Sequence, residues 1–391
     1  MNRRWTVKLE DVAEINPRVP KHLTDDDDVA FVPMSAVSED GTLGAHGTRP
    51  YVEVKKGYTY FERGDVLVAK ITPCFENGKA ALVDNLVEQI GFGSTEFHVL
   101  RPGPDLDGRY LFYMLWNEKF RAVAAGGMTG SAGQKRVPAE LLRRTEIRLP
   151  PLDDQRRIAA ILDKADALRQ KRKRAIALLD SLTRSIFLVM FGDPRSNPHG
   201  MRIARLEDVA RFYAGNSLPA GEPYTGQHNG HLMLKVSDMN SPGNEEIIRS
   251  SALWSSAPGS RAGTCPAGSI VFPKRGGAIA TNKKRVISRP AILDPNVMAV
   301  ASDPDYLEAD YLYEWFQGFN LADISSGSSV PQLNKQDLAP LEIVVPPLQK
   351  QRAFSERKAT LNDTKAAAIS SSSTADRLFA SLQHRAFSGQ L

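Results

Sequence analysis

The chain has 391 residues, 42% hydrophobic and 24% charged, a globular composition that excludes a disordered or collagenous chain. At roughly 100–200 residues per domain, this length predicts two domains. The net charge of +5 favours an anionic partner without identifying one. The longest purely apolar run, Ile186–Phe191, is far shorter than the ~18–20 residues that cross a bilayer, so we expect a cytoplasmic protein without a membrane partner.

The first 150 residues predict a mixed segment of short strands and one aromatic-rich helix. Apolar runs between Gly, Pro and Asn predict strands over residues 65–69 and 97–100, and residues 109–120 predict the helix. A long helix is predicted over residues 152–191, because Pro150-Pro151 is tolerated only in a helix's first turn and Gly192 with Pro194 supplies a stop.

The second half predicts the same elements again. Strands are expected over residues 269–272 and 342–345, and an aromatic-rich helix over residues 311–319. A second long helix follows, although its middle, Ser370–Thr374, is a poor helix former.

The strongest feature of the sequence is an internal duplication. Val7–Ala13 is similar to Ala204–Ala210. Leu-Pro-Pro-Leu-Asp-Asp-Gln-Arg at 149–156 is similar to Val-Pro-Pro-Leu-Gln-Lys-Gln-Arg at 345–352. We therefore divide the chain into two similar α+β (or α/β) domains in tandem and two helical segments. The predicted boundaries are 1–150 (first domain), 151–193 (first helical segment), 194–345 (second domain) and 346–391 (second helical segment).

Each long helix carries an apolar stripe at heptad spacing. This stripe is too long for one globular segment to bury. We predict that the two helices pack against each other as an antiparallel coiled coil, giving a pseudo-two-fold molecule with one globular domain at each end. The alternative is that each helix folds back onto its own domain. The predicted seam consists of Ile158, Ile161, Ala165, Leu168, Leu179, Leu182, Ile186, Phe354, Leu361, Ala368, Ala375 and Leu382.

These features together resemble the specificity (S) subunits of type I restriction-modification systems. The resemblance covers the whole chain and includes the Pro-Pro-Leu-x-x-Gln-Arg start of each helix, the stretches Val68–Ala80 and Gly93–Pro102 in the first domain, and Phe272–Ala278 and Val330–Lys335 in the second. In this family two target-recognition domains alternate with two helical segments.

The resemblance implies a non-catalytic reader of double-stranded DNA with a bipartite target, one half-site for each domain. It also implies two modification (M) subunits that bind S-adenosylmethionine and methylate adenine N6. Two restriction (R) subunits that use ATP and Mg²⁺ are implied as well, in a bacterial or archaeal cytoplasm. No cofactor is expected in this chain itself.

Two other function classes stay open at this stage. A self-contained methyltransferase or nuclease would need motifs that we do not find: both Pro-Pro pairs lack a preceding Asn or Asp, and Asn77–Ala80 is not a phosphate-binding loop. The two cysteines and the scattered histidines predict no metal site. A coiled-coil scaffold that binds no nucleic acid is the second alternative.

Loops rich in Gly and in polar or basic side chains are the candidate DNA contacts, because Lys and Arg neutralise phosphates while Asn, Gln and Arg also pair with base edges. Lys283 and Lys284 are both expected on phosphates, and Asp25–Asp28 is expected to lie away from DNA. Arg169–Arg174 is expected to be a solvated helix face, with contact to a modification subunit or to phosphate as the alternative. The candidates are Lys70, Thr72, Asn77, Lys79, Ser131, Gln134, Lys135, Arg136, Lys274, Arg275, Thr281, Asn282, Lys283, Lys284, Arg285, Ser328, Gln332 and Asn334.

Overall fold

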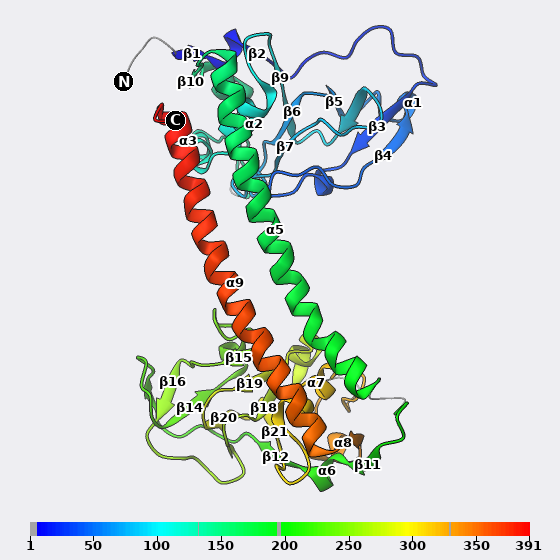
Figure 1. The fold of residues 1–391 in the computed structure, drawn as a ribbon, viewed down its shortest axis with the longest axis vertical. Coiled ribbons are helices and arrows are strands. Elements are labelled where there is room, and N and C mark those ends of the chain that lie inside the picture. Colours follow the sequence, from blue (N-terminus) through cyan, green and yellow to red (C-terminus); the bar gives the residue numbers. More distant parts are fainter. Residues whose placement is uncertain (1–5, 132, 194–196, 328–329) are drawn as a thin grey trace. The chain divides into compact units, whose positions relative to one another are not determined.

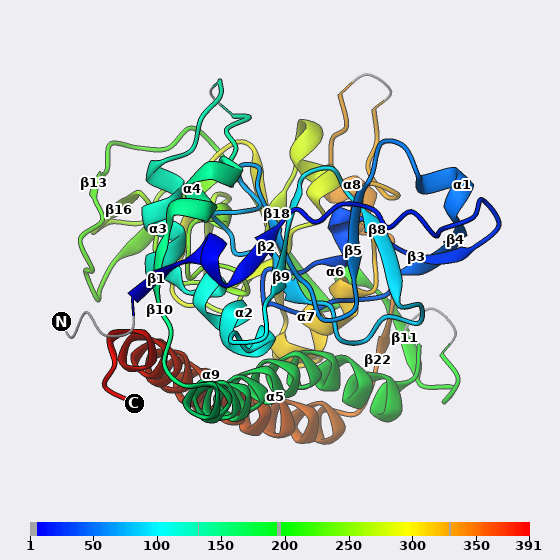
Figure 2. The same ribbon diagram turned by 90° about the horizontal axis from the view of Figure 1, so that it is seen from above.

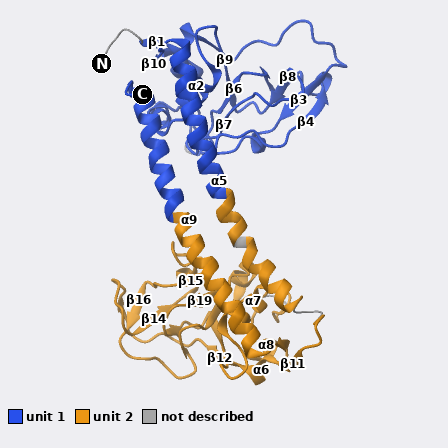
Figure 3. Ribbon diagram, in the orientation of Figure 1, with its two compact units in different colours: residues 1–173, 370–391 blue, residues 174–369 orange. Residues whose placement is uncertain are grey.

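The computed structural model describes residues 6–131, 133–193, 197–327 and 330–391. The chain divides into two compact units, residues 1–173 with 370–391 (unit 1) and residues 174–369 (unit 2), shown in Figure 3. Both boundaries fall inside long helices, because each helix packs into a globular part at both of its ends. The four-part division by element type stays a prediction.

The globular part of unit 1 contains two sheets and a strand pair (Figure 1). One sheet is antiparallel and runs, from edge to edge, β2 (Ala13–Ile15), β9 (Phe97–Pro102), β6 (Val66–Ala69) and β7 (Ala80–Leu82). The other runs β4 (Gly47–Pro50), β3 (Asp28–Val32), β8 (Ile90–Gly93) and β5 (Thr59–Glu62), with β3 and β8 parallel. The separate pair is β1 (Thr6–Lys8) with β10 (Glu146–Arg148).

The helices of unit 1 connect these strands to the long helices. Asp107 caps α2 by accepting hydrogen bonds from the amides of Arg109 and Tyr110. The predicted aromatic helix breaks at Asn117, which caps the following helix. The helical elements are η2 (Leu9–Asp11), η3 (Met34–Ala36), α1 (Tyr51–Val54), α2 (Gly108–Trp116), α3 (Glu118–Gly126), α4 (Ala139–Arg144) and the first part of α5 (Leu152–Phe191).

Unit 2 repeats this strand order with extra edge strands. Its antiparallel sheet runs β12 (Ala210–Ala214), β21 (Val297–Ser302), β18 (Ile270–Pro273) and β19 (Arg285–Ile287), with β15 (Ile247–Ile248) added in parallel. The other runs β13 (Glu222–Pro223), β16 (Leu253–Ser255), β14 (His231–Leu234), β20 (Ala291–Leu293) and β17 (Thr264–Cys265). The separate pair is β11 (Arg202–Arg205) with β22 (Glu342–Val345).

The helical elements of unit 2 also follow those of unit 1. They are α6 (Leu206–Val209), η4 (Val236–Asn240), η5 (Gly276–Thr281), α7 (Ala309–Gln317), α8 (Lys335–Leu338) and part of α9 (Leu348–Ser388). The predicted long helices, the second aromatic helix and the four predicted strands are thus confirmed. Ser370–Thr374 is helical despite its low propensity, and Thr374 Oγ1 donates to Ser370 O (3.1 Å).

In each unit an aromatic helix fills the space between a sheet and the long helices. In unit 1, α2 packs on the β2-containing sheet and against α5 and α9 (Figures 1 and 2), where Tyr110 meets Phe387 with ring centroids 5.4 Å apart. In unit 2, Tyr311 of α7 lies 5.4 Å from Phe187 of α5, which lies 5.6 Å from Phe354 of α9.

The glutamine in each Pro-Pro-Leu-x-x-Gln-Arg motif joins the start of a long helix to the loop before an aromatic helix. Gln155 is fully buried: its Oε1 accepts from Asp107 N (2.8 Å), and its Nε2 donates to Asp105 O (2.9 Å) and Pro150 O (2.8 Å). Gln351 makes the same three kinds of bond in unit 2. A buried backbone group without a partner is costly, which explains the motif in physical terms.

The inner face of α5 is the predicted one only in part; Ile161 is half-buried as predicted. The heptad positions Ile158, Ala165, Leu179 and Ile186 are buried or half-buried, but Leu168 is 56% and Leu182 40% exposed. The second inward series is one residue further along the chain. It consists of Leu162, Arg169, Ile176, Thr183 and Met190.

Arg169 explains why Leu168 was wrongly placed on the inner face. Its guanidinium pairs with Asp166 and with Asp376 of α9 (both 2.7 Å) and lies 4.4 Å from the Phe379 ring centroid. Arg172 Nη1 donates to Ser371 O of α9 (3.2 Å). These two arginines therefore face α9, and the prediction of a wholly solvated basic face is wrong. In α9 the predicted positions Phe354, Leu361, Ala368, Ala375 and Leu382 are all buried or half-buried.

Within the described part of the chain, no helix is long and apolar enough to cross a membrane.

Candidate nucleic-acid interface

Two loops of unit 1 that carry predicted DNA contacts lie side by side. One, residues 70–79, follows β6, and the other, residues 129–137, precedes α4. A β-bridge joins Ile71 to Arg136, and Val137 N donates to Lys70 O (2.9 Å). Backbone pairing therefore gathers both predicted clusters of unit 1 at one place.

The same pairing recurs in unit 2 between residues 274–285, which follow β18, and residues 326–335. A β-bridge joins Arg275 to Gln332, and Leu333 N donates to Lys274 O (2.9 Å). We call the two segments of each unit its paired loops. Because the duplicated halves build the same pairing, the paired loops are the candidate interface.

The candidates differ in how far solvent reaches them. Ser328 lies outside the described residues. The exposed candidates are Asn77, Ser131, Gln134, Lys135, Arg275, Thr281 and Gln332, and the half-buried ones are Lys70, Thr72, Lys79, Arg136, Lys274, Asn282, Lys283, Arg285 and Asn334. Burial and the neighbouring Arg275 lower the pKa of Lys274, so this half-buried amine sits in a positive environment.

Some candidates are already bonded within the protein. Arg136 pairs with Glu96 (2.8 Å), and this contact lowers the pKa of the Glu96 carboxyl. Asn77 Nδ2 donates to Glu39 Oε1 (2.9 Å). These two side chains help to shape the loops, whereas Lys135 and Arg275 are exposed cations at the bridges.

Lys284 corrects the sequence-based prediction most clearly. Its side chain is 1% exposed, and Nζ donates to Phe319 O (2.6 Å) and Asn282 Oδ1 (2.8 Å). Burial lowers its pKa to about 8. Asn282 Oδ1 also accepts from Leu321 N (2.9 Å), while Asn282 itself is left-handed (φ 51°). Lys284 and Asn282 therefore tie a paired loop to the end of α7, and Lys284 does not reach DNA.

Two further residues belong to this region but were not among the candidates. Lys335 is exposed directly after Asn334, with Nζ 5.7 Å from the Phe212 ring centroid; its place beside the other candidates was the available signal. His98 is buried between Asn16 (3.2 Å) and Val137 O (2.8 Å), and burial lowers its pKa. His98 thus anchors one end of a paired loop, which no sequence pattern indicated.

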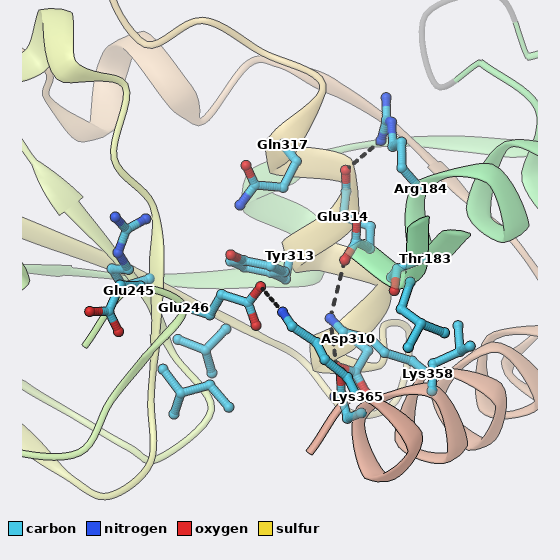
Figure 4. A pocket seen from close by; sticks show the side chains of 16 residues that line it. Thr183, Arg184, Glu245, Glu246, Asp310, Tyr313, Glu314, Gln317, Lys358 and Lys365 are labelled. Carbon is cyan, nitrogen blue, oxygen red and sulfur yellow. Dashed lines mark hydrogen bonds and ion pairs between the residues drawn. The ribbon is translucent and has the colours of Figure 1, made fainter. Parts of the chain in front are cut away.

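A cavity of about 350 Å³ in unit 2 is lined by charged groups that mostly partner one another (Figure 4). Lys358 contacts Asp310 (3.1 Å) and Glu314 (3.2 Å), and Lys365 contacts Glu246 (3.2 Å). These pairs join α9 to α7 and to the loop before β15. In the described residues, no group of three or more His, Cys, Asp or Glu side chains could hold a metal ion.

Comparison with known proteins finds similarity mainly in the first part of the chain. Residues 2–178 match the family model described as the type I restriction modification DNA specificity domain. The chain is 44% identical to the specificity subunit of the Escherichia coli type I restriction enzyme EcoAI over 157 residues, which is 39% of this chain and 26% of that protein. It is 39% identical to the EcoEI specificity subunit of Escherichia coli over 180 residues, 45% of this chain and 30% of that protein. The matches therefore span less than a third of these relatives.

A solved structure covers nearly the whole chain. It comes from work on complex assembly and conformational transition of the type I R-M system, with a TM-score of 0.62 at 21% identity. The alignment includes 99% of this chain and 98% of the other. This likeness shows that the mixed fold, with its two sheet-rich domains and long helices, is shared.

Proposed function

We propose that the chain is the subunit through which a type I restriction-modification complex recognises DNA, because residues 2–178 match the model of the type I restriction modification DNA specificity domain and part of the chain is similar to two type I specificity subunits. It reads double-stranded DNA and leaves the chemistry to partner subunits.

The observation that carries this proposal is the repetition of the paired loops. Each unit offers exposed Lys, Arg, Gln or Asn side chains on two loops that a β-bridge joins, Ile71 to Arg136 in unit 1 and Arg275 to Gln332 in unit 2. Cations of this kind bind phosphates, and amide or guanidinium groups distinguish base edges. Two such surfaces in one chain suit a bipartite target, one half-site for each unit.

We further propose that α5 and α9 form an antiparallel coiled coil that spaces the units in a pseudo-two-fold molecule. The support comes from contacts within the units: Arg169 meets Asp376 and Arg172 meets Ser371 in unit 1, so rising numbers in α5 pair with falling numbers in α9. Inward positions recur every seven residues in both helices.

The outward face of α5 suits a partner helix. Leu168, Leu182 and Val189 are 56%, 40% and 80% exposed and, with exposed Ala175, are spaced seven residues apart. An apolar heptad stripe in water favours burial against another helix. We assign this stripe to modification subunits, two per complex, which supply S-adenosylmethionine and methylate adenine N6. Two restriction subunits supply ATP-dependent, Mg²⁺-dependent cleavage.

Removing an exposed cation at a bridge should weaken DNA binding. Lys135→Ala in unit 1 or Arg275→Ala in unit 2 should each flatten the slope of log K against log salt by about 0.9, because one phosphate contact releases about that many counterions. The measurement is DNA affinity of the chain with its modification subunit between about 50 and 200 mM salt.

Lys56→Ala serves as the matched control, since Lys56 is an exposed cation outside the paired loops. Its salt slope should equal that of the unchanged chain. If Lys135→Ala and Arg275→Ala both kept the slope of log K against log salt of the unchanged chain, the paired loops would not be the DNA contact surface. Methyl transfer by the isolated chain, given labelled S-adenosylmethionine, would contradict its non-catalytic role.

A further inference from the structure

Trp116, at the end of α2, connects a paired loop of unit 1 to the long helices. The residue is 8% exposed, and its Nε1 donates to Gly78 O (3.1 Å) and to Glu39 O (3.2 Å). Glu39 in turn accepts the hydrogen bond of Asn77. One indole N–H thus binds the segment at Glu39 and the loop at Gly78, which follows β6 and carries candidate DNA contacts.

The loop at Gly78 is tightly fitted to this support. Gly78 has a φ of +86°, and a Cβ there would lie 2.9 Å from Arg121 Nη1. Arg121 Nη1 donates to Glu76 O, and its Nε donates to Trp116 O (3.2 Å). Trp116 and Arg121 therefore fix two carbonyl groups, those of Gly78 and Glu76, in the segment between the candidates Thr72 and Lys79.

The other side of the Trp116 ring faces the helices. Its centroid lies 5.8 Å from that of Phe379 in α9, in edge-to-face geometry, and 5.8 Å from the Arg169 guanidinium of α5. Arg169 pairs with Asp376 of α9. The same indole therefore contacts the loop through its N–H and both long helices through its ring.

We propose that Trp116 is a positioning residue for recognition of one half-site: it holds residues 76–79 in the shape that reads DNA and ties that shape to α5 and α9. The proposal rests on the proposed function of the chain. Because Trp116 is buried behind the loop, it acts by holding residues 76–79 in place and does not touch DNA. Its loss should affect only the half-site read by unit 1.

Trp116→Phe tests this, because phenylalanine keeps an aromatic ring but lacks the N–H donor; the ring volume that it also loses is lost equally in Trp315→Phe. The full chain is expressed with its modification subunit, and methylated adenines are mapped. Losing a hydrogen bond worth about 0.5–1.5 kcal/mol corresponds to roughly 2- to 12-fold. In Trp116→Phe we expect methylation of sites with a base change in the half-site read by unit 1 to rise by that factor, relative to methylation of the unaltered target. Discrimination against base changes in the half-site read by unit 2 should stay the same.

Trp315→Phe is the matched control. Trp315 is buried in α7, and among the described residues its Nε1 has no hydrogen-bond partner, so the substitution removes no such bond. Arg121→Met is a second test variant that releases Glu76 O and should relax the same half-site as Trp116→Phe.

Unchanged discrimination in both Trp116→Phe and Arg121→Met would overturn the proposal, as would equal relaxation of both half-sites. If the unchanged chain directs methylation to no bipartite site, the proposed function itself fails, and this outcome is seen without any variant.

Discussion

Gln155→Leu should lower the free energy of unfolding of unit 1 by about 3 kcal/mol or more. The substitution removes three hydrogen bonds of a fully buried amide and leaves Asp107 N, Asp105 O and Pro150 O without partners. Each buried polar group that is left without a hydrogen-bond partner costs about 1–3 kcal/mol of folding free energy. At about 2–4 °C per kcal/mol, the melting temperature should fall by about 6–12 °C in a calorimetric scan.

Gln170→Leu provides the control on the same helix. Its Nε2 is buried without a hydrogen-bond partner among the described residues, so leucine should cost little there. Gln351→Leu should reproduce the loss in unit 2, where the same bonds recur. A melting temperature within about 1 °C of the unchanged chain for both Gln155→Leu and Gln351→Leu would refute this account of the motif.

Charging the outward stripe of α5 should abolish assembly without unfolding the chain. In Leu168→Glu with Leu182→Glu, two exposed leucines become carboxylates that a partner helix would have to bury. Each leucine contributes about 1.5–3 kcal/mol when buried, so affinity for the modification subunit should fall at least about 100-fold. Titration of the purified subunits, with mass measurement of the complex, gives this value.

Ala177→Glu is the control for charge on α5. Ala177 is exposed, and it lies five residues from Leu182, which turns it about 140° away from the stripe. It should bind the modification subunit normally. If the variant with both Leu168→Glu and Leu182→Glu bound the modification subunit normally, that subunit would bind elsewhere on the chain.

The ends of the long helices could be predicted because strong local residues mark them. The predicted span 152–191 coincides with α5, since Pro150-Pro151 restricts the start and Gly192, with φ +78°, supplies the left-handed stop. The duplication likewise predicted that one globular architecture would occur twice, and the two units share their strand order.

The side chains facing inward could not be predicted from hydrophobicity alone. Leu168 and Arg169 are adjacent, and pattern reasoning puts leucine inside. Arginine lies inside instead, because its carbon stem packs near Phe379 and its charge is met by Asp166 and Asp376. Asp376 is distant in sequence, so no local pattern contains this compensation.

The candidate interface was predicted as clusters but not as individual contacts. Gly-rich polar loops were named as separate candidates in each half, and long-range pairing such as Arg275 with Gln332, which no local pattern contains, brings them together. Lys283 and Lys284 are equivalent in sequence, yet only Lys284 is buried, because the backbone carbonyl of Phe319, just after α7, accepts a hydrogen bond from its amine. That acceptor follows from tertiary packing.

Mapping the methylated adenines of a hybrid chain tests the central claim most directly. Residues of about 5–145 are replaced by the equivalent segment of a type I specificity subunit, and the hybrid is expressed with the modification subunit proposed as the partner of this chain. If each unit reads one half-site and the helices set the spacing, one half-site sequence changes while the other half-site and the spacer length stay the same. An active hybrid in which both half-sites change, or neither does, would contradict the account.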